Sequence, residues 1–328
     1  MSLDILVTGC AGFIGFHVCK ALLDQGHRVI GIDNLNPYYD VKLKQARLQQ
    51  IQQHPRFAFH PLDIADHQAL EEVWHHYPGI MHVIHLAAQA GVRYSLTHPR
   101  SYIRSNIDGH LNILEIARAR PGFQHLVYAS SSSVYGANQK TPFSTNDPVD
   151  HPISLYAATK RSDELMSFTY AHLFNVPATG LRFFTVYGPW GRPDMAYFSF
   201  TRDILAGKPI TLFNHGQMRR DFTYIDDVVS GVLAALHRPP KAHQDSPPHR
   251  VFNLGNSRAE SLGDFVATLE ELCAKKATIN FAPMQPGDVP ETFADTRLSQ
   301  EILGYQPHTP IQEGLAKFVA WYRHFYSC

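Results

Sequence analysis

Tyr156 and Lys160 stand in the pattern Y-A-A-T-K and could together carry out proton transfer. A tyrosine phenol titrates near about pH 10, so alone it is a poor base at neutral pH. A lysine four residues later lies one helical turn on, where its ammonium would stabilise the phenolate. A serine hydroxyl from the run Ser130–Ser133 could share the substrate proton. This trio suits removal of a proton from a sugar hydroxyl whose carbon gives up a hydride.

The pattern Y-x-x-x-K is common by chance, so the hypothesis depends on a nearby hydride acceptor. Asp4–Thr8 predicts a buried strand, and Arg28–Ile32 predicts a second strand that ends at Asp33. The turn between them carries three glycines, Gly9, Gly12 and Gly15, followed by helical spacing. Such glycines let a pyrophosphate approach the backbone at a helix N-terminus. Asp33 is placed to accept from ribose hydroxyls and would repel a 2′-phosphate, which favours NAD over NADP.

Strand and helix patterns alternate through the first half of the chain. Strands are predicted at Phe57–His60, His82–Leu86, Gln124–Ser130 and Ala178–Phe183. Helices are predicted at Val41–Gln53, His67–His76, Tyr102–Arg118 and Leu155–Leu173. This alternation predicts an α/β fold, a Rossmann-type doubly wound parallel sheet with right-handed crossovers. Ligands bind beyond the carboxyl ends of such strands. Six candidate residues fall there: Gly9, Asp33, Asp63, Ala87, Ser131 and Phe183.

The second half has looser spacing and predicts a smaller α/β lobe. A turn-rich loop at Gly188–Asp194 comes first. Further helices are predicted at Phe198–Ala206, Asp226–Leu236, Leu262–Cys273 and Ile311–Tyr326, and strands at Ile210–Phe213 and Val251–Leu254. We therefore expect an NAD-binding domain over residues 1–186, to which some later segments return, and a substrate lobe over residues 187–328.

Composition narrows the class of partner. The 328 residues are 44% hydrophobic, with 29 basic and 29 acidic side chains, so the zero net charge argues against a nucleic-acid partner. Apolar runs fall short of the ~20 residues of a membrane helix, and the first strand leaves no room for a signal peptide. The four cysteines form no C-x-x-C pair, which suits a reduced cytoplasm. The 20 scattered histidines predict no metal site.

The segment T-G-C-A-G-F-I-G resembles the extended short-chain dehydrogenase/reductase superfamily, and the likeness covers nearly the whole chain. It continues through H-L-A-A-Q at His85–Gln89 and through Asn106. The resemblance implies that Ser131, Tyr156 and Lys160 are catalytic. It also implies an NAD site formed by Gly9, Gly12, Phe13, Ile14, Gly15, Asp33, Asn34, Asp63, Ile64, Leu86, Ala87, Ala88, Gln89, Asn106, Ser130, Tyr156, Lys160 and Phe183.

The C-terminal half resembles nucleotide-sugar enzymes of this superfamily. I-T-L-F-N resembles the strand that holds uracil, which assigns Phe213 to the base. The segment R-R-D-F-T-Y-I-D-D implies that Arg220 contacts the substrate diphosphate, because its fork of donors suits anionic oxygens. Q-P-G-D carries Gln285 where many UDP-galactose epimerases have arginine, so the resemblance assigns Asp288 to the uridine ribose.

Four longer stretches resemble UDP-glucuronate 4-epimerases: Ala87–Ser95, Ala129–Gly136, Ser154–Lys160 and Phe183–Met195. The implied activity is the reversible conversion of UDP-glucuronate to UDP-galacturonate through a 4-keto intermediate, with hydride passed to and from tightly bound NAD. Ser132, Ser133 and Arg192 would hold the sugar carboxylate. The substrate residues implied in all are Arg93, Ser131, Ser132, Ser133, Thr185, Arg192, Phe213, Arg220 and Asp288.

Several alternatives stay open. UDP-glucuronate decarboxylases and 4,6-dehydratases resemble T-D-E-V-Y-G or T-S-E-V-Y-G, whereas Ser132 and Ser133 stand here in place of the acids, and the decarboxylase is the runner-up. Arg192 and Gln285 argue against a UDP-glucose 4-epimerase. A non-catalytic NAD-binding protein would be expected to lose one member of the catalytic trio. The resemblance also implies a homodimer, formed through a four-helix bundle of Tyr102–Arg118, Leu155–Leu173 and their twofold mates.

Overall fold

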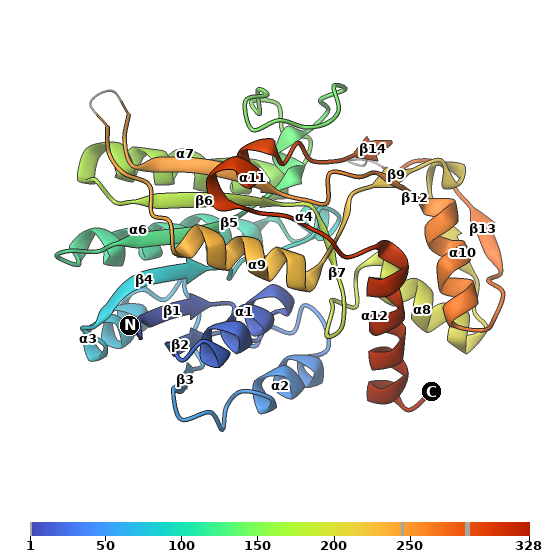
Figure 1. Cartoon of the computed structure of the whole chain (residues 1–328), viewed down its shortest axis with the longest axis horizontal. Helices are drawn as coiled ribbons and strands as arrows, with labels where there is room; N and C mark the ends of the chain where they lie inside the picture. The colour runs from blue at the N-terminus through green and yellow to red at the C-terminus, as the bar shows by residue number, and fades with distance from the viewer. Residues whose placement is uncertain (1, 244–245, 286–288) are drawn as a thin grey trace.

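A seven-stranded parallel sheet forms the centre of the computed structural model, which describes residues 2–243, 246–285 and 289–328 (Figure 1). In spatial order its strands are β11 (His249–Leu254), β6 (Ala178–Phe183), β5 (His125–Ser131), β4 (Ile80–His85), β1 (Asp4–Thr8), β2 (Arg28–Ile32) and β3 (Phe57–His60). All six neighbouring pairs are parallel. The predicted fold class is confirmed, and strand ends differ from the predicted ones by at most two residues.

The strands are apolar on both faces because helices cover both faces of the sheet. Side chains alternate between the two sides, so Ile5 and Val7 join one hydrophobic cluster and Leu6 joins the other. The helices α1 (Phe13–Asp24), α2 (Val41–Gln49) and α9 (Ile225–Leu236) contribute to the first cluster. The helices α3 (His67–His76) and α6 (Gly109–Ala119) contribute to the second, beside α7 (Leu155–Phe174).

The range predicted as a helix, Tyr102–Arg118, is helical throughout, but its first turns are not α-helical. The chain forms α4 (Tyr94–Thr97) and α5 (Pro99–Tyr102), then a π-helical segment η1 (Ile103–Asp108), and only then α6. A β-carbon at Gly109 would lie 2.6 Å from the side chain of Ile64, so the backbone here packs tightly against the loop after β3. π-turns insert an extra residue into the helix and re-aim side chains, a property that spacing alone does not reveal.

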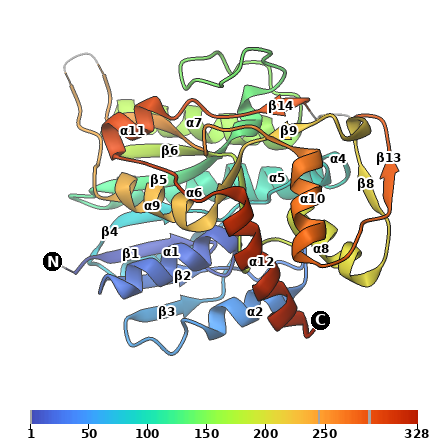
Figure 2. The same cartoon turned by 45° about the vertical axis from the view of Figure 1, so that its right-hand side comes forward.

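Smaller elements lie beyond the carboxyl ends of the sheet strands (Figures 1 and 2). The helices there are α8 (Ala196–Ala206), α10 (Leu262–Leu272) and α12 (Ile311–Tyr326). Three short sheets accompany them: β7 (Thr185–Tyr187) with β10 (Phe222–Tyr224); β8 (Ile210–Leu212) with β13 (Ile279–Phe281); and β9 (Arg219–Arg220) between β12 (Glu260–Ser261) and β14 (Glu291–Thr292). Two shorter turns of helix are η2 (Ser132–Tyr135) and η3 (Asn214–Gly216), whereas α11 (Arg297–Leu303) packs against β11 of the main sheet and against α9 (Figure 1).

Segments from the two halves of the chain interleave. β11 pairs with β6 in the main sheet, and α9 packs beside α1. The division at residues 186 and 187 stays a prediction. Of the helices in the described ranges, none combines the length and apolarity needed to cross a membrane.

Candidate active site

One pocket opens beyond the carboxyl ends of β1, β2, β4, β5 and β6. It gathers nearly all the predicted cofactor residues: Gly9, Gly12, Phe13, Ile14, Gly15, Asp33, Asn34, Asp63, Ile64, Leu86, Ala87, Ala88, Gln89, Ser130, Tyr156, Lys160 and Phe183. Ser131 and Arg192 line the same pocket. A parallel sheet brings these segments together because all its strands end at one edge.

The glycine-rich turn forms a close-packed cradle. Gly9 has a φ of +74°, and a β-carbon there would lie 2.8 Å from the backbone nitrogen of Ala87. A β-carbon at Gly15 would collide with the carbonyl oxygen of Gly9. Helix α1 begins directly after Gly12, so its first backbone N–H groups lack helical partners at the pocket. This arrangement fits the pyrophosphate of a dinucleotide.

Asp33 is almost fully buried at the end of β2. Its carboxylate accepts hydrogen bonds from the backbone nitrogens of Ala11 (3.1 Å) and Leu35 (2.8 Å), which leaves acceptor capacity for ribose hydroxyls. Lys44 Nζ lies 3.8 Å from Asp33 Oδ1 and lines the pocket. Lys44 was not predicted from the sequence, because its burial follows from the packing of α2 and not from any pattern in the chain.

The predicted catalytic trio comes from two elements, α7 and β5. Helix α7 begins after Ser154, whose hydroxyl accepts from the Ala157 nitrogen at 3.1 Å, and this cap places Tyr156 in the first turn. Lys160 is buried one turn on, and its ammonium donates to the Ala129 carbonyl at 2.9 Å. Ser131 ends β5 on the same pocket wall.

Asp163 is a further buried group that the sequence analysis missed. Its Oδ2 lies 3.0 Å from Lys160 Nζ, while its Oδ1 is buried without a recorded hydrogen-bond partner. Burial raises the pKa of Asp163 to about 6, against the opposing effect of Lys160. A charged acid three residues after Lys160 on the same helix was the visible signal.

The serine-rich turn rests on buried polar groups. Ser130 donates to Glu164 at 2.6 Å, and Arg182 holds both oxygens of Glu164 at 2.8 and 2.9 Å. Burial alone would raise the pKa of Glu164, but hydrogen bonds and charge from Arg182 hold that pKa below its ordinary value. The Arg182 guanidinium also lies 4.8 Å from the ring centre of Tyr135, whose hydroxyl donates to Asn253 at 2.7 Å.

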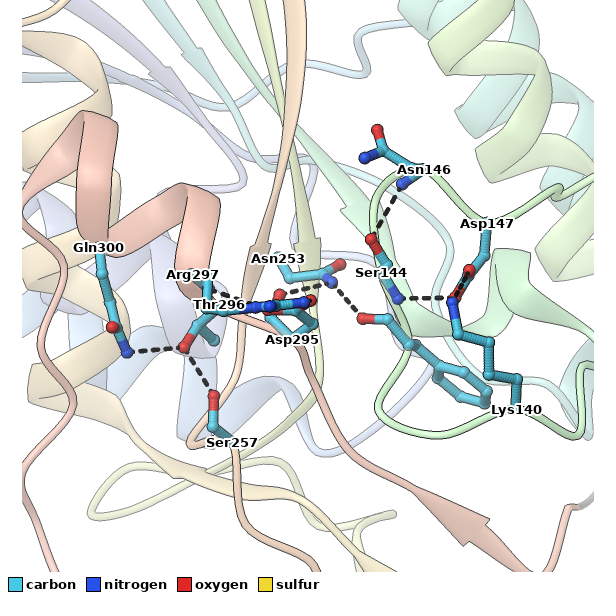
Figure 3. A network of polar contacts seen from close by, with 11 residues as sticks. Lys140, Ser144, Asn146, Asp147, Asn253, Ser257, Asp295, Thr296, Arg297 and Gln300 are labelled. Atoms are coloured by element: carbon cyan, nitrogen blue, oxygen red, sulfur yellow. Dashed lines mark hydrogen bonds and ion pairs between the residues drawn. The ribbon is translucent and has the colours of Figure 1, made fainter.

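Asn253 extends this support into a surface loop, as Figure 3 shows. Its amide nitrogen donates to the carbonyl oxygens of Phe143 (2.8 Å) and Asp295 (3.1 Å). Ser144 and Asp147 close the loop with a bond of 2.7 Å from the Ser144 nitrogen (Figure 3). A network of buried hydrogen bonds through Glu164, Arg182 and Asn253 therefore fixes the position of the turn that carries the serines.

Ser132 and Ser133 begin η2 and are half-buried. The Ser131 hydroxyl donates to Ser133 Oγ at 3.1 Å and accepts from the Ser133 nitrogen at 3.1 Å. Neither serine is among the residues that line the pocket. The clamp role that the resemblance implies for these two hydroxyls stays a prediction.

Arg192 lies at the pocket with its fork engaged by a carboxylate. Its Nε and Nη2 bind Asp194 at 3.0 and 2.5 Å, and the Tyr38 hydroxyl donates to Asp194 at 3.1 Å. Although burial lowers it, the pKa of Arg192 is raised overall by Asp194. A sugar carboxylate would therefore share or replace Asp194 as the partner of Arg192.

Other predicted substrate residues lie outside the pocket lining. The guanidinium of Arg93 lies 5.0 Å from the ring centre of Phe213, so the structure brings these two together. Arg220 Nη1 donates to the carbonyl oxygens of Arg219 (2.9 Å) and Pro290 (3.0 Å). Thr185 begins β7, where its nitrogen donates to the carbonyl of Asp221 at 3.1 Å.

Two residues of the Q-P-G-D segment fall at the edge of what the structure describes. Asp288, predicted to bind the uridine ribose, lies outside the described residues. Gln285 is described, and its buried Oε1 has no hydrogen-bond partner among the residues that the structure describes. The substrate role of this segment stays a prediction.

Asn106 does not line the pocket but binds Gln89, which does. It is buried in η1, where its Oδ1 accepts from the Gln89 nitrogen at 2.8 Å. Its amide nitrogen donates to the Gln89 carbonyl (3.1 Å) and to Thr159 of α7 (2.9 Å). Asn106 therefore holds the Gln89 wall of the cofactor pocket against the catalytic helix. Among the described residues, no group of three or more His, Cys, Asp and Glu side chains could hold a metal ion.

Residues 5–255 match the model of the NAD dependent epimerase/dehydratase family. The chain belongs to this family. The predicted NAD dependence and the predicted epimerase family are thereby confirmed.

Similar proteins point to one branch of the family. UDP-glucuronate 4-epimerase 4 of Arabidopsis thaliana is 50% identical, over 99% of this chain and 76% of its own length. A probable UDP-glucuronate 4-epimerase of Rhizobium meliloti is 47% identical, over 98% of this chain and 97% of its own. The crystal structure of UDP-glucuronic acid 4-epimerase from Bacillus cereus in complex with UDP-glucuronic acid and NAD is 35% identical. Its TM-score is 0.89, and the match covers 99% of this chain and 100% of that one.

Proposed function

We propose that the protein is an NAD-dependent UDP-glucuronate 4-epimerase that interconverts UDP-glucuronate and UDP-galacturonate. The observation that carries this proposal is one pocket lined by Tyr156, Lys160, Ser131 and Arg192 beside the glycine-rich turn. The names of the relatives and of the Bacillus cereus structure support the choice of sugar.

In this proposal, residues of α7 and β5 carry out the proton transfer. The ammonium of Lys160, held by the Ala129 carbonyl and Asp163, stabilises the phenolate of Tyr156. Tyr156 takes the proton of the sugar 4-hydroxyl, and the Ser131 hydroxyl orients that oxygen. Held beside the glycine-rich turn, NAD would supply the acceptor and donor of the hydride at carbon 4. The 4-keto sugar turns between the two transfers, so the hydride would return to the opposite face of carbon 4 while Tyr156 returns the proton to the 4-oxygen.

The sugar carboxylate requires restraint during this cycle. A 4-keto uronate is a β-keto acid, and it loses carbon dioxide when the bond to its carboxylate aligns with the carbonyl π system. Arg192, with the hydroxyls of Ser132 and Ser133, would hold the carboxylate away from that alignment. A neutral sugar offers Arg192 no carboxylate that could share or replace Asp194, so it would gain no ion pair there, which disfavours its binding.

Proton NMR of the purified protein with UDP-glucuronate and, separately, UDP-glucose tests the function. We expect UDP-galacturonate in the first sample only, without added NAD, because the cofactor is regenerated in each cycle. UDP-xylose or a 4-keto pentose would identify a decarboxylase. Conversion of UDP-glucose alone would mean that Arg192 serves Asp194 and not a substrate. No change in either sample, with NAD added, would contradict the proposal.

We also propose a homodimer built through α6 and α7 with their mates. Large apolar side chains stay exposed along these helices and the segments before them: Leu96, Ile103, Leu111, Leu165, Phe168, Leu173 and Phe174. Two α6–α7 pairs facing each other would cover such a surface as a four-helix bundle.

We further propose a cytoplasmic location, because a reducing compartment suits the buried thiols of Cys10 and Cys19.

A further inference from the structure

Arg47 of α2 is a fully buried arginine whose donors all bind oxygen atoms. Nη1 donates to the Ala11 carbonyl (2.9 Å) and the Tyr39 hydroxyl (2.7 Å). Nε and Nη2 donate to the Trp190 carbonyl at 3.0 and 2.6 Å, and Nη2 also donates to the Gly191 carbonyl at 3.0 Å. The five N–H groups of the guanidinium are thereby satisfied.

These partners are unusual for a buried cation. Buried arginines are ordinarily paired with an acid, because removing the charge from water is costly. Among the described residues, no ion pair to Arg47 is found, and its partners are carbonyl and phenol oxygens. Replacing Arg47 by an apolar side chain would leave the carbonyl oxygens of Ala11, Trp190 and Gly191 without these donors. The bonds that Arg47 makes therefore indicate a positioning task.

The bonds of Arg47 join two segments far apart in sequence. Ala11 lies inside the glycine-rich turn, and its nitrogen donates to Asp33. Trp190 and Gly191 come directly before Arg192, which lines the pocket. Arg47 thus bridges the cofactor cradle and the loop that carries the candidate carboxylate-binding arginine.

The backbone carbonyls of the loop before Arg192 bind side chains of the N-terminal half, while the Trp190 ring packs against Trp321 and Phe325 of α12. His17 of α1 hydrogen-bonds the Pro189 carbonyl at 3.0 Å, so the carbonyls of residues 189, 190 and 191 all accept from N-terminal side chains. Burial lowers the pKa of His17 to about 4, so its ring is neutral at working pH. Trp190 has a φ of +63°, a rarely populated conformation that its surroundings must impose.

We propose that Arg47 is a positioning residue that couples the glycine-rich turn to the Arg192 loop and thereby sets the preference for a uronate over a neutral sugar. This inference rests on the proposed function. Small displacements of a charged fork weaken its bidentate bonds, so the position of the loop decides how well Arg192 meets a carboxylate. The uridine diphosphate part of the substrate, which lies away from that carboxylate, would be affected less.

Two substitutions of Arg47 distinguish the effect of its hydrogen bonds to two segments from the effect of its positive charge. R47K keeps the positive charge but replaces a rigid fork of five donors by one flexible ammonium, which cannot span both segments. R47M removes both charge and donors. R120M is the matched control, because Arg120 also donates to a tryptophan carbonyl, that of Trp74, but at the end of α6 and outside the pocket lining.

The measurement is calorimetric binding of UDP-glucuronate, UDP-glucose and UDP to each NAD-loaded protein, with bound NAD quantified after purification. We expect R47K to weaken UDP-glucuronate binding about tenfold with UDP affinity nearly unchanged, R47M to weaken it further and lose NAD, and R120M to match the wild type. Proportional loss for all three ligands, or a lower melting temperature with unchanged affinities, would overturn the coupling and leave a structural role.

Failure of the proposed function would look different. A wild-type protein that does not bind or epimerise UDP-glucuronate contradicts that function before any variant is compared. If neither Arg47 variant folds, H17F removes the neighbouring bond to Pro189 and is expected to shift the ratio of UDP-glucuronate to UDP affinity in the same direction. An unchanged ratio in H17F would count against the inference.

Discussion

At the scale of single residues, the positive charge of Lys160 interacts with several oxygen atoms at once. Its ammonium donates to the Ala129 carbonyl and to Asp163, and in the proposed mechanism it also stabilises the phenolate of Tyr156. Opposite charges at this depth interact more strongly than in water. The strength of Tyr156 as a base is therefore set partly by a carboxylate that does not line the pocket.

Replacing Tyr156 by phenylalanine removes the base and leaves the ring. We expect kcat for UDP-glucuronate to fall by about 10²–10⁴-fold, while NAD and UDP binding persist. The turnover assay and the NAD content of the same preparation check this. A Y156F variant that retains near-normal turnover would move the proton transfer to another group.

Replacing Asp163 by asparagine alters the pH profile. Without the carboxylate, the charge of Lys160 acts on Tyr156 undiminished and favours its phenolate. The acid limb of the kcat/KM profile should therefore move to lower pH in D163N. D108N, which removes an exposed acid in η1, is the control. A profile that stays in place, or moves to higher pH, contradicts this electrostatic role.

The other titratable groups near Asp163 are not expected to change charge near pH 6, so they should not alter the pH profile of D163N. They are Lys160 and Glu164 on α7, His110 from α6 and Tyr128 from β5. Burial lowers the pKa of His110 well below its ordinary value and raises that of Tyr128, so both are neutral at working pH. Arg182 keeps Glu164 ionised. Within this cluster, Asp163 is the group that titrates near pH 6.

At the scale of elements, irregular segments position the pocket walls. The π-helical segment η1 aims Asn106 at both backbone groups of Gln89 and at Thr159. Asp221, between β9 and β10, accepts from the backbone nitrogens of Asn256, Ser257 and Ala294. Each side chain ties together segments that are distant in sequence.

N106A should weaken NAD retention. The substitution leaves the buried nitrogen and carbonyl of Gln89 without partners, at a cost of about 1–3 kcal/mol per group, so the wall against the cofactor loosens. We expect an increase of about tenfold or more in the NAD dissociation constant. N138A is a suitable control, because Asn138 also donates to a backbone carbonyl, that of Pro148 at 2.9 Å, but in a loop outside the pocket lining. Equal NAD affinity in N106A and wild type would contradict this role.

D221N should destabilise the fold, because an amide offers one acceptor oxygen where the carboxylate offers two. We expect a loss of about 2–4 kcal/mol in the free energy of unfolding in urea. D150N, which changes an exposed acid, should stay close to wild type. A D221N protein as stable as D150N would refute the anchoring role.

The wild type should also lose stability as pH rises through Asp221. Burial raises the pKa of Asp221 to about 6, above its ordinary 3.8. Between those values the folded protein holds a proton that the unfolded chain releases, so this stability is present below about pH 4 and lost above about pH 6. The difference in unfolding free energy between wild type and D221N should therefore be smaller at pH 7 than at pH 4.5.

At the scale of the whole molecule, α6 and α7 expose an apolar surface that the proposed dimer would bury. Leu165 and Phe168 on α7 are 51% and 47% exposed, and α6 beside them exposes Leu111. L165E with F168E should shift the proposed dimer towards monomer, because each buried glutamate in the bundle would lack a partner. Light scattering after size exclusion measures this. L298E, which changes an exposed leucine of α11, is the control, and a double variant of unchanged mass would place the interface elsewhere.

Much of the site could be predicted from the sequence because its signals are local. The three glycines, Asp33, and the Tyr156–Lys160 pair each depend on a strand end or one helical turn, and short-range spacing encodes both. Parallel pairing then gathers them at one edge, as the topology rules require. The alternation of strands and helices therefore determined the fold class and the location of the pocket.

Tertiary structure alone decided which distant groups meet. Arg47 and the carbonyls of Trp190 and Gly191 are more than a hundred residues apart, and no periodicity connects them. Asn106 faces Gln89 because η1 is π-helical, which its spacing does not show. Hydrogen bonds between remote segments depend on packing of the finished layers, so they become visible only when the chain has folded.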